Sequence, residues 1–250
     1  MTAPLRPLIF ARPLQFARPL IAVAALALTT AAAALLPSAG KAQTAAPAWT
    51  EKVSQSQVGG HILGNVAAPQ KIIEYMSYTC PHCAAFEQDS NPALPTRFIA
   101  DGKTSLEVRN FIRDPVDLTV ALLARCGEPA SFFRRHKGLL ASQKAWMARG
   151  AALGRDGQAA WYQGDTNTRL KRIASDLGLY DELRRHAPLA TDAQINACLI
   201  DKAEQNKVLA MTKFATDTVK VQGTPSFTLN GKLLSDVYDW KSLEPLLASR

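Results

Sequence analysis

The order of apolar and polar positions along the chain predicts its first elements. Residues 71–77 form a short apolar stretch that is typical of a buried strand. Residues 106–112 alternate apolar and polar side chains with the period of a second strand. Helix-favouring residues lie between the two, at 83–88. Strand, helix and strand in this order indicate a β-α-β unit in an α/β protein.

Helical periodicity then continues from residue 114 to residue 218. Leu118, Leu122 and Cys126 share one helix face at positions i, i+4 and i+8. We expect a further helix over residues 131–147, and a capping box at 191–194 predicts the start of a helix that carries Cys198. These patterns predict an all-helical segment of about 100 residues.

The pattern returns to strand after this segment. Residues 226–229 and 232–234 flank Asn230 and Gly231, and Asn-Gly between short apolar runs is a strong hairpin signal. Asp239 can cap a final helix. The sequence therefore predicts one discontinuous α/β domain, interrupted by an inserted all-helical domain. The α/β domain comprises residues 58–113 and 219–250, and the insertion comprises residues 114–218.

The N-terminal residues have the plan of a secretory signal. Arg6, Arg12 and Arg18 precede an apolar run at 20–36, no acidic residue occurs among them, and small residues surround Ala42. We expect a signal peptide over residues 1–42, with an uncleaved membrane anchor as the alternative. The Ala- and Pro-containing residues 43–57 are interpreted as a linker.

The charge of the chain argues against a nucleic-acid partner. The formal net charge is +8, and removal of the signal segment lowers it by four. The remaining Lys and Arg residues are scattered among acids and do not form a basic patch. The chain is also long enough to bury a core without disulfides, so each of its four cysteines needs its own explanation.

Cys80 and Cys83 form a Cys-Pro-His-Cys motif at the predicted junction of strand and helix. Free N–H groups and the helix dipole at that terminus favour a thiolate on Cys80, which becomes the nucleophile. Cys83 lies one turn later, within disulfide reach. Pro81 fits the first helical position, and His82 adds a polar group that favours ionisation of Cys80.

Two other interpretations of this motif are weaker. A zinc site would need a second pair of ligands, and Cys126 and Cys198 stand alone on helix faces without a histidine pair at ligand spacing. A purely structural bridge between Cys80 and Cys83 would close too small a loop to restrict the unfolded chain. We therefore expect a redox-active disulfide and no metal.

The motif and its surroundings resemble the DsbA family of periplasmic disulfide oxidases. The resemblance rests on residues 73–75, on 80–87 and on Gly223-Thr224-Pro225 after the helical segment, and it covers roughly residues 58–247. It implies a thioredoxin-like fold with an inserted helical domain. It further implies a periplasmic enzyme that introduces disulfide bonds into exported proteins and needs no cofactor.

The resemblance also implies roles for residues outside the motif. The bond between Thr224 and Pro225 is expected to be cis and to pack against the disulfide, and both residues, with Pro81, are expected to bind substrate. Glu74 matches a buried acid that assists proton transfer. The alternative for Glu74 is a carboxylate at a strand edge in water, but the apolar residues around it favour burial.

This sequence departs from the best-studied family members at two places. Thr224 stands where they carry Val, and Cys126 and Cys198 form an extra pair. Because an exported protein meets an oxidising compartment, we expect Cys126 and Cys198 to form a structural disulfide. The alternative is two buried free thiols.

The expected partners are unfolded exported proteins with cysteine pairs and a quinone-linked membrane protein that reoxidises the enzyme, which we expect to be a monomer. A reductase or isomerase on the same fold is the first alternative. A non-catalytic peptide-binding chaperone is the second, and retention of both motif cysteines, His82 and Pro225 argues against it.

Overall fold

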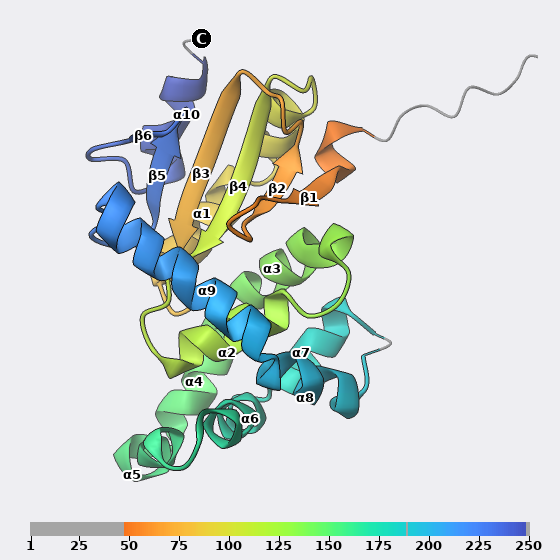
Figure 1. Cartoon of the computed structure of the whole chain (residues 1–250), viewed down its shortest axis with the longest axis vertical. Coiled ribbons are helices and arrows are strands. Elements are labelled where there is room, and N and C mark those ends of the chain that lie inside the picture. The colour runs from red at the N-terminus through yellow and green to blue at the C-terminus, as the bar shows by residue number, and fades with distance from the viewer. Residues whose placement is uncertain (1–47, 189, 249–250) are drawn as a thin grey trace, which may run out of the picture. The chain divides into compact units, whose positions relative to one another are not determined.

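The computed structural model describes residues 48–188 and 190–248 of the chain (Figure 1). The expected signal peptide and the membrane anchor considered as its alternative, both placed in residues 1–42, lie outside the described residues. Within the described part, no helix is both long enough and apolar enough to span a membrane.

A six-stranded sheet forms one part of the fold, with the strand order β1-β2-β4-β3-β5-β6. β3 and β4 run parallel at its centre, and every other neighbouring pair is antiparallel. The strands are β1 (Val53–Gln55), β2 (His61–Gly64), β3 (Gln70–Met76), β4 (Thr104–Asn110), β5 (Ser226–Leu229) and β6 (Lys232–Leu233).

β3 is the central strand that the apolar residues 71–77 predict. Ile72, Tyr75 and Met76 are each 1% exposed or less, as expected for a strand covered on both faces. β5 pairs with the other edge of β3, with Tyr75 opposite Ser226. Because β5 is antiparallel to β3, the residues that precede β5 lie beside the end of β3.

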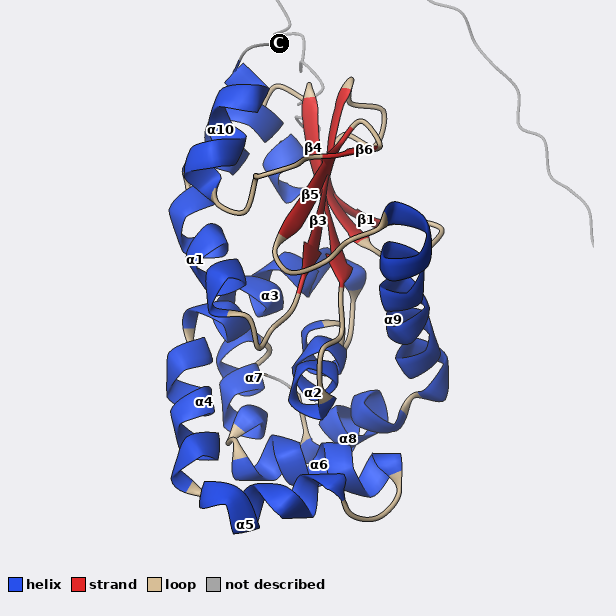
Figure 2. Ribbon diagram, turned by 90° about the vertical axis from the view of Figure 1, so that its left-hand side faces the viewer, coloured by secondary structure: helices blue, strands red, loops and turns tan. Residues whose placement is uncertain are grey.

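Helices cover both faces of the sheet and continue beyond one of its ends. Figure 2 shows α1 (Pro81–Ser90) and α10 (Trp240–Ala248) on one face and α9 (Lys202–Phe214) on the opposite face. β3 and β4 point toward a helical block, so the chain that leaves β3 meets this block (Figure 1). The block comprises α2 (Pro115–Ala124), α3 (Phe132–Ala141), α4 (Gln143–Ala152), α5 (Gly154–Ala159), α6 (Thr166–Asp176), α7 (Leu179–His186) and α8 (Asp192–Ile200).

Short helical turns complete the described elements: η1 (Trp49–Glu51), η2 (Leu94–Ile99), η3 (Pro129–Ser131), η4 (Ala160–Tyr162) and η5 (Ala215–Val219). One buried apolar core runs from the sheet into the helical block. It includes Met76 and Phe86 beside the sheet and Leu122 and Trp146 in the block, all at most 1% exposed. The block is therefore held to the sheet by apolar packing.

The expected linker over residues 43–57 is wrong for its described C-terminal part. Residues 49–51 form η1 and residues 53–55 form β1, in which Val53 pairs with Leu63 of β2. Trp49 packs against the core. A three-residue strand is too short to show a period, and it is stabilised by backbone pairing with β2, which the sequence pattern does not reveal.

The single helix expected over residues 131–147 is instead two helices, α3 and α4, which meet at Ser142. The Ser142 hydroxyl donates hydrogen bonds to the carbonyls of Gly138 at 3.1 Å and Leu139 at 3.3 Å. A serine hydroxyl that binds the carbonyls of the preceding turn bends or ends a helix. This break places Gln143 at the first position of α4.

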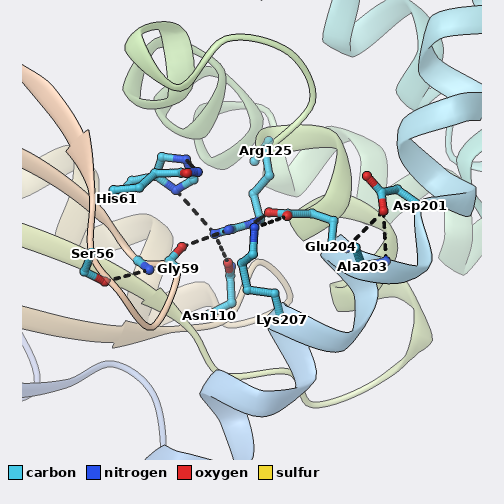
Figure 3. A network of polar contacts seen from close by, with 12 residues as sticks. Ser56, Gly59, His61, Asn110, Arg125, Asp201, Ala203, Glu204 and Lys207 are labelled. Atoms are coloured by element: carbon cyan, nitrogen blue, oxygen red, sulfur yellow. Dashed lines mark hydrogen bonds and ion pairs between the residues drawn. The ribbon is translucent and has the colours of Figure 1, made fainter.

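Arg125, directly after α2, connects the helical block to the sheet through a buried polar network (Figure 3). Its side chain is 0% exposed and contacts Glu204 of α9 at 2.5 Å. It also donates to the Gly59 carbonyl at 2.8 Å and to Asn110 Oδ1 at 3.4 Å, and it lies 3.3 Å from His61 Nδ1. Burial and the nearby cations lower the pKa of His61 to about 2, so His61 is neutral and can accept from Arg125.

We predict that Glu204→Gln lowers the free energy of unfolding by about 2 kcal/mol at pH 7, because it weakens a charge-assisted hydrogen bond to a buried cation. Urea unfolding measures this loss. The matched control is Asp217→Asn, which removes an exposed pair with Lys213 and should change stability much less, because solvent screens an exposed ion pair. Equal effects of the two variants would contradict the role of the network.

Cys126 and Cys198 are joined by a disulfide, as the sequence predicts. Their Cα atoms lie 5.5 Å apart, and the bond links the residue two positions after α2 to α8. The alternative of two free thiols is therefore excluded in this structure.

Candidate active site

Cys80 and Cys83 lie where the chain passes from β3 into α1, at the end of the sheet that faces the helical block. Cys80 is the N-cap of α1, with an extended backbone, and Pro81 occupies the first helical position. Pro81 is suited to that position because its missing N–H would be unpaired there. Cys80 is 3% exposed and Cys83 is 0% exposed, and both carry free thiols.

The two sulfur atoms differ strongly in acidity. The Cys83 thiol, the Thr224 hydroxyl and the backbone N–H groups of Cys83 and His82 can donate to the ionised sulfur, and together they outweigh burial and lower the pKa of Cys80 to about 5. Burial, followed by hydrogen bonding to Cys80 and the charge of Glu74, raises the pKa of Cys83 well above its usual value. The geometry therefore favours a thiolate at Cys80 and a protonated thiol at Cys83.

Thr224 and Pro225 reach this centre from the segment before β5. The Thr224–Pro225 peptide bond is cis, as the resemblance implied, and Pro225 is buried. Cys80 Sγ lies 3.1 Å from the Thr224 carbonyl oxygen, which accepts the thiol hydrogen. The Thr224 hydroxyl oxygen is buried and has no hydrogen-bond partner among the described residues. Once Cys80 ionises, this hydroxyl is available to donate to the sulfur.

Glu74 is buried and interacts electrostatically with both cysteines, so the alternative of a water-exposed carboxylate is wrong. It lies in β3 between Val108 of β4 and Phe227 of β5, and it is 1% exposed. Burial, then the charges of Glu87 and Cys80, raise the pKa of Glu74 well above its usual value. A carboxyl group in this setting can hold a proton at neutral pH.

His82 lies at the surface, in the first turn of α1. The contribution of residue 82 to the lowered pKa of Cys80 comes from its backbone N–H, which donates to the sulfur. From the sequence, that contribution was expected of the imidazole. The role of the imidazole itself stays a prediction.

The polar residues that hold the loop between β3 and α1 were not predicted from the sequence. Asp117 Oδ1 accepts the Tyr78 N–H at 2.7 Å, and Asp114 Oδ2 accepts the Thr79 hydroxyl at 2.8 Å. Burial raises the pKa of Asp117 to about 7. Asp114 followed by Pro115 is a recognisable helix start, but its contact with a loop 35 residues earlier is a tertiary feature.

A hollow of about 420 Å³ opens beside this loop. Its lining runs from Thr79, next to Cys80, to the exposed side chains of Met147 and Tyr162. Apolar side chains of the helical block thus line the surface beside Thr79.

Within the described ranges, no group of three or more His, Cys, Asp or Glu side chains is arranged to hold a metal ion.

A family model described as Thioredoxin matches residues 56–248. The chain belongs to the thioredoxin family. Curated relatives of this thioredoxin-family chain are named protein-disulfide oxidoreductases. The Rickettsia bellii protein is 29% identical over 171 residues, which cover 68% of this chain and 56% of the relative. The Rickettsia typhi protein is 30% identical over 171 residues, 68% of this chain and 54% of its own length. The chain thus spans about half the length of these relatives.

Solved structures show where the thioredoxin-family chain lies among known folds. The crystal structure of a protein-disulfide isomerase from Novosphingobium aromaticivorans has a TM-score of 0.73 and 39% identity, covering 76% of this chain and 96% of that chain. Alpha-DsbA1 from Wolbachia pipientis has a TM-score of 0.60 and 22% identity, and the match covers 78% of this chain and 92% of that chain. The second match shows a shared fold, which is thioredoxin-like with a helical insertion.

Proposed function

We propose that this protein is a thiol-disulfide oxidoreductase that oxidises cysteine pairs in exported proteins through Cys80 and Cys83. The observation that carries the proposal is the opposite shift of the two sulfur pKa values at the N-terminus of α1. A stabilised thiolate favours the reduced enzyme, which makes its disulfide a strong oxidant. The names of the curated relatives agree with this reaction class.

The reaction proceeds in two exchanges. A substrate thiolate attacks Sγ of Cys80 in the oxidised enzyme, the Cys80–Cys83 bond breaks, and Cys83 leaves and takes up a proton. The second substrate thiolate then attacks the substrate sulfur of the mixed disulfide and releases Cys80 as a thiolate. The substrate loses two electrons and the enzyme gains them. Cys80 is the better final leaving group because its pKa is the lower of the two.

Neighbouring residues support these steps. Glu74 is buried near Cys83, and its raised pKa allows it to supply the proton that Cys83 requires. The Thr224 backbone lies beside Cys80 and is proposed to pair with an extended substrate, with Pro225 and Pro81 as further contacts. The exposed Met147 and Tyr162 beside Thr79 suit an unfolded chain with apolar side chains.

The proposed setting is the periplasm, on the basis of the leader-like N-terminal sequence and the resemblance to exported oxidases. There the reduced enzyme would pass its two electrons to a quinone-linked membrane partner. The enzyme would work as a monomer on unfolded substrates. Residues 58–113 and 219–250 would act as the redox domain, with residues 114–218 as the insertion.

The decisive experiment is the reduction potential of the protein without residues 1–42, measured in glutathione buffers. A value near −120 mV supports an oxidase, and a value near −270 mV supports a reductase, on the scale set by DsbA and thioredoxin. A potential near thioredoxin's would overturn the proposed direction of electron flow.

An isomerase is the second candidate, and it is favoured by the name of the 39% identical solved structure. Reactivation of a protein with scrambled disulfides separates the two activities. An isomerase restores native pairing from the scrambled state, whereas an oxidase acts faster on the fully reduced protein.

The thiolate can be titrated directly. We predict that the reduced protein gains ultraviolet absorbance near 240 nm with a midpoint near pH 5, because Cys80 ionises there. Since the pKa of Cys80 is lower in the folded protein, ionisation stabilises the reduced fold as the pH rises from about 5 to about 9, and this stability is lost as the pH falls through 5. A midpoint near pH 9 would contradict the assignment. Cys80→Ser is the control, in which the transition should disappear.

A further inference from the structure

Tyr78, two residues before Cys80, is the residue at which the helical block holds the redox loop. Its side chain is 0% exposed. Asp117 of α2 accepts its N–H at 2.7 Å, and His136 of α3 bonds its hydroxyl through Nδ1 at 2.8 Å. Its carbonyl accepts a hydrogen bond from Gln143 Nε2 of α4 at 2.7 Å. Three helices of the block thus bind the three polar groups of one loop residue.

Gln143 makes a second contact from the same atom. Its Nε2 donates to the Cys80 carbonyl at 2.9 Å. A glutamine amide carries two hydrogens, so both are used, one on each carbonyl. Gln143 is 5% exposed and does not cap its own helix. One side chain at the start of α4 therefore bridges the carbonyls of Tyr78 and Cys80 across the turn that leads into α1.

This bridge acts on the peptide that orients the sulfur. Cys80 is the N-cap of α1, and its carbonyl would ordinarily be held by the first bond within the helix. Here that bond, from the Ala84 N–H, is long at 3.4 Å, whereas the bond from Gln143 is 0.5 Å shorter. The helical block therefore contributes the shorter of the two hydrogen bonds that fix the Cys80 carbonyl.

The direction of the Cys80 side chain follows from this peptide. The sulfur must face the N–H groups of His82 and Cys83 and the Thr224 side chain for its charge to be stabilised. Rotation of the Cys80 peptide would move the sulfur away from these donors. Burial of a glutamine costs free energy unless its amide is hydrogen-bonded. An apolar side chain would fill the space of Gln143 without this cost, so packing alone does not explain a glutamine at this position.

We propose that Gln143 is a positioning residue for the redox reaction, which holds the carbonyls of Tyr78 and Cys80 and so keeps the Cys80 sulfur at the donors of α1 and Thr224. The inference rests on the proposed function. It assigns to the helical block a direct part in setting the reactivity of the redox centre.

The test compares Gln143→Met with Gln205→Met. Methionine keeps the length and approximate volume of glutamine and removes both donors. Gln205 is the matched control, since it is 4% exposed and its Nε2 donates to the Leu199 carbonyl at 2.8 Å, away from the redox loop. The readouts are the 240 nm titration of Cys80, the reduction potential and urea unfolding, all on the chain without residues 1–42.

We expect Gln143→Met to raise the titration midpoint of Cys80 by about one pH unit, a tenfold fall in the thiolate-to-thiol ratio, and to lower the reduction potential. Gln205→Met should lose stability without moving either value. The proposal is overturned if Gln143→Met loses stability like the control while its titration and potential match the parent protein.

A second variant keeps the test informative if Gln143→Met does not fold. Gln143→Asn retains the amide but is one methylene shorter, so it cannot bridge both carbonyls. It should shift the midpoint in the same direction by a smaller amount, and an unchanged midpoint in the folded variant overturns the proposal. Failure of the parent protein to oxidise a reduced substrate would refute the proposed function and leave the titration result in place.

Discussion

The Cys83→Ser variant is expected to accumulate mixed disulfides with its substrates and to lose its oxidase turnover. Cys80 at the N-terminus of α1 carries the stabilised sulfur, so substrates attack and leave at Cys80. Without the Cys83 thiol, the enzyme cannot re-form its own disulfide to release a bound partner. Non-reducing electrophoresis of the variant, incubated with an oxidised cysteine-containing protein, should show a covalent complex that a reductant dissolves.

Cys80→Ser is the matched variant and should form no such complex, because the buried Cys83 sulfur is protonated and inaccessible. Loss of either sulfur should abolish catalytic oxidation of a reduced substrate, a fall of at least about 100-fold for a covalent step that has no replacement. Complexes that appear with Cys80→Ser instead of Cys83→Ser would reverse the assignment of the two roles.

Removal of the second disulfide is expected to destabilise the protein without changing the redox centre. The bond joins cysteines separated by 72 positions in the sequence, and for a loop of this size the chain-entropy model gives about 4 kcal/mol. The double variant Cys126→Ser, Cys198→Ser should therefore unfold at a markedly lower urea concentration. Its Cys80 titration midpoint should equal that of the parent protein.

The two disulfides should also respond differently to mild reduction. Cys126 and Cys198 are less buried than Cys80 and Cys83, so accessibility does not set the order of opening. The stabilised Cys80 thiolate favours the reduced form of its pair, so the bond between Cys80 and Cys83 should open first. Counting alkylated thiols should give two at low reductant, with stability retained. Four alkylated thiols with unchanged thermal stability would show that the second bond has no structural role.

The sequence by itself predicted the elements whose side chains repeat with a clear period. The apolar residues of β3, the Asn230-Gly231 hairpin and the capping box of α8 are all present as expected. Each is encoded locally, in residues close along the chain. The Cys-x-x-Cys spacing likewise predicted the candidate reactive pair, because a helix N-terminus soon after a strand favours a thiolate at its first residue.

Other features were outside what a local pattern can encode. The edge strand β1 has three residues and is defined by its pairing with β2. The break at Ser142 depends on a rotamer that lets the hydroxyl reach the preceding carbonyls. The sequence favoured burial of Glu74, but its proximity to Glu87 and Cys80 became known only from the folded structure.

For the site, the sequence alone predicted which residues react, and the tertiary structure decided how they are held. Cys80, Cys83, Thr224 and Pro225 could be found because their motifs are short and carry their own geometry. Gln143 lies 63 residues after Cys80 and shows no pattern that sets it apart. Its proposed role follows from the carbonyls of Tyr78 and Cys80, in the loop after β3. Buried polar groups need hydrogen-bond partners, and only the tertiary structure decides which side chain provides them.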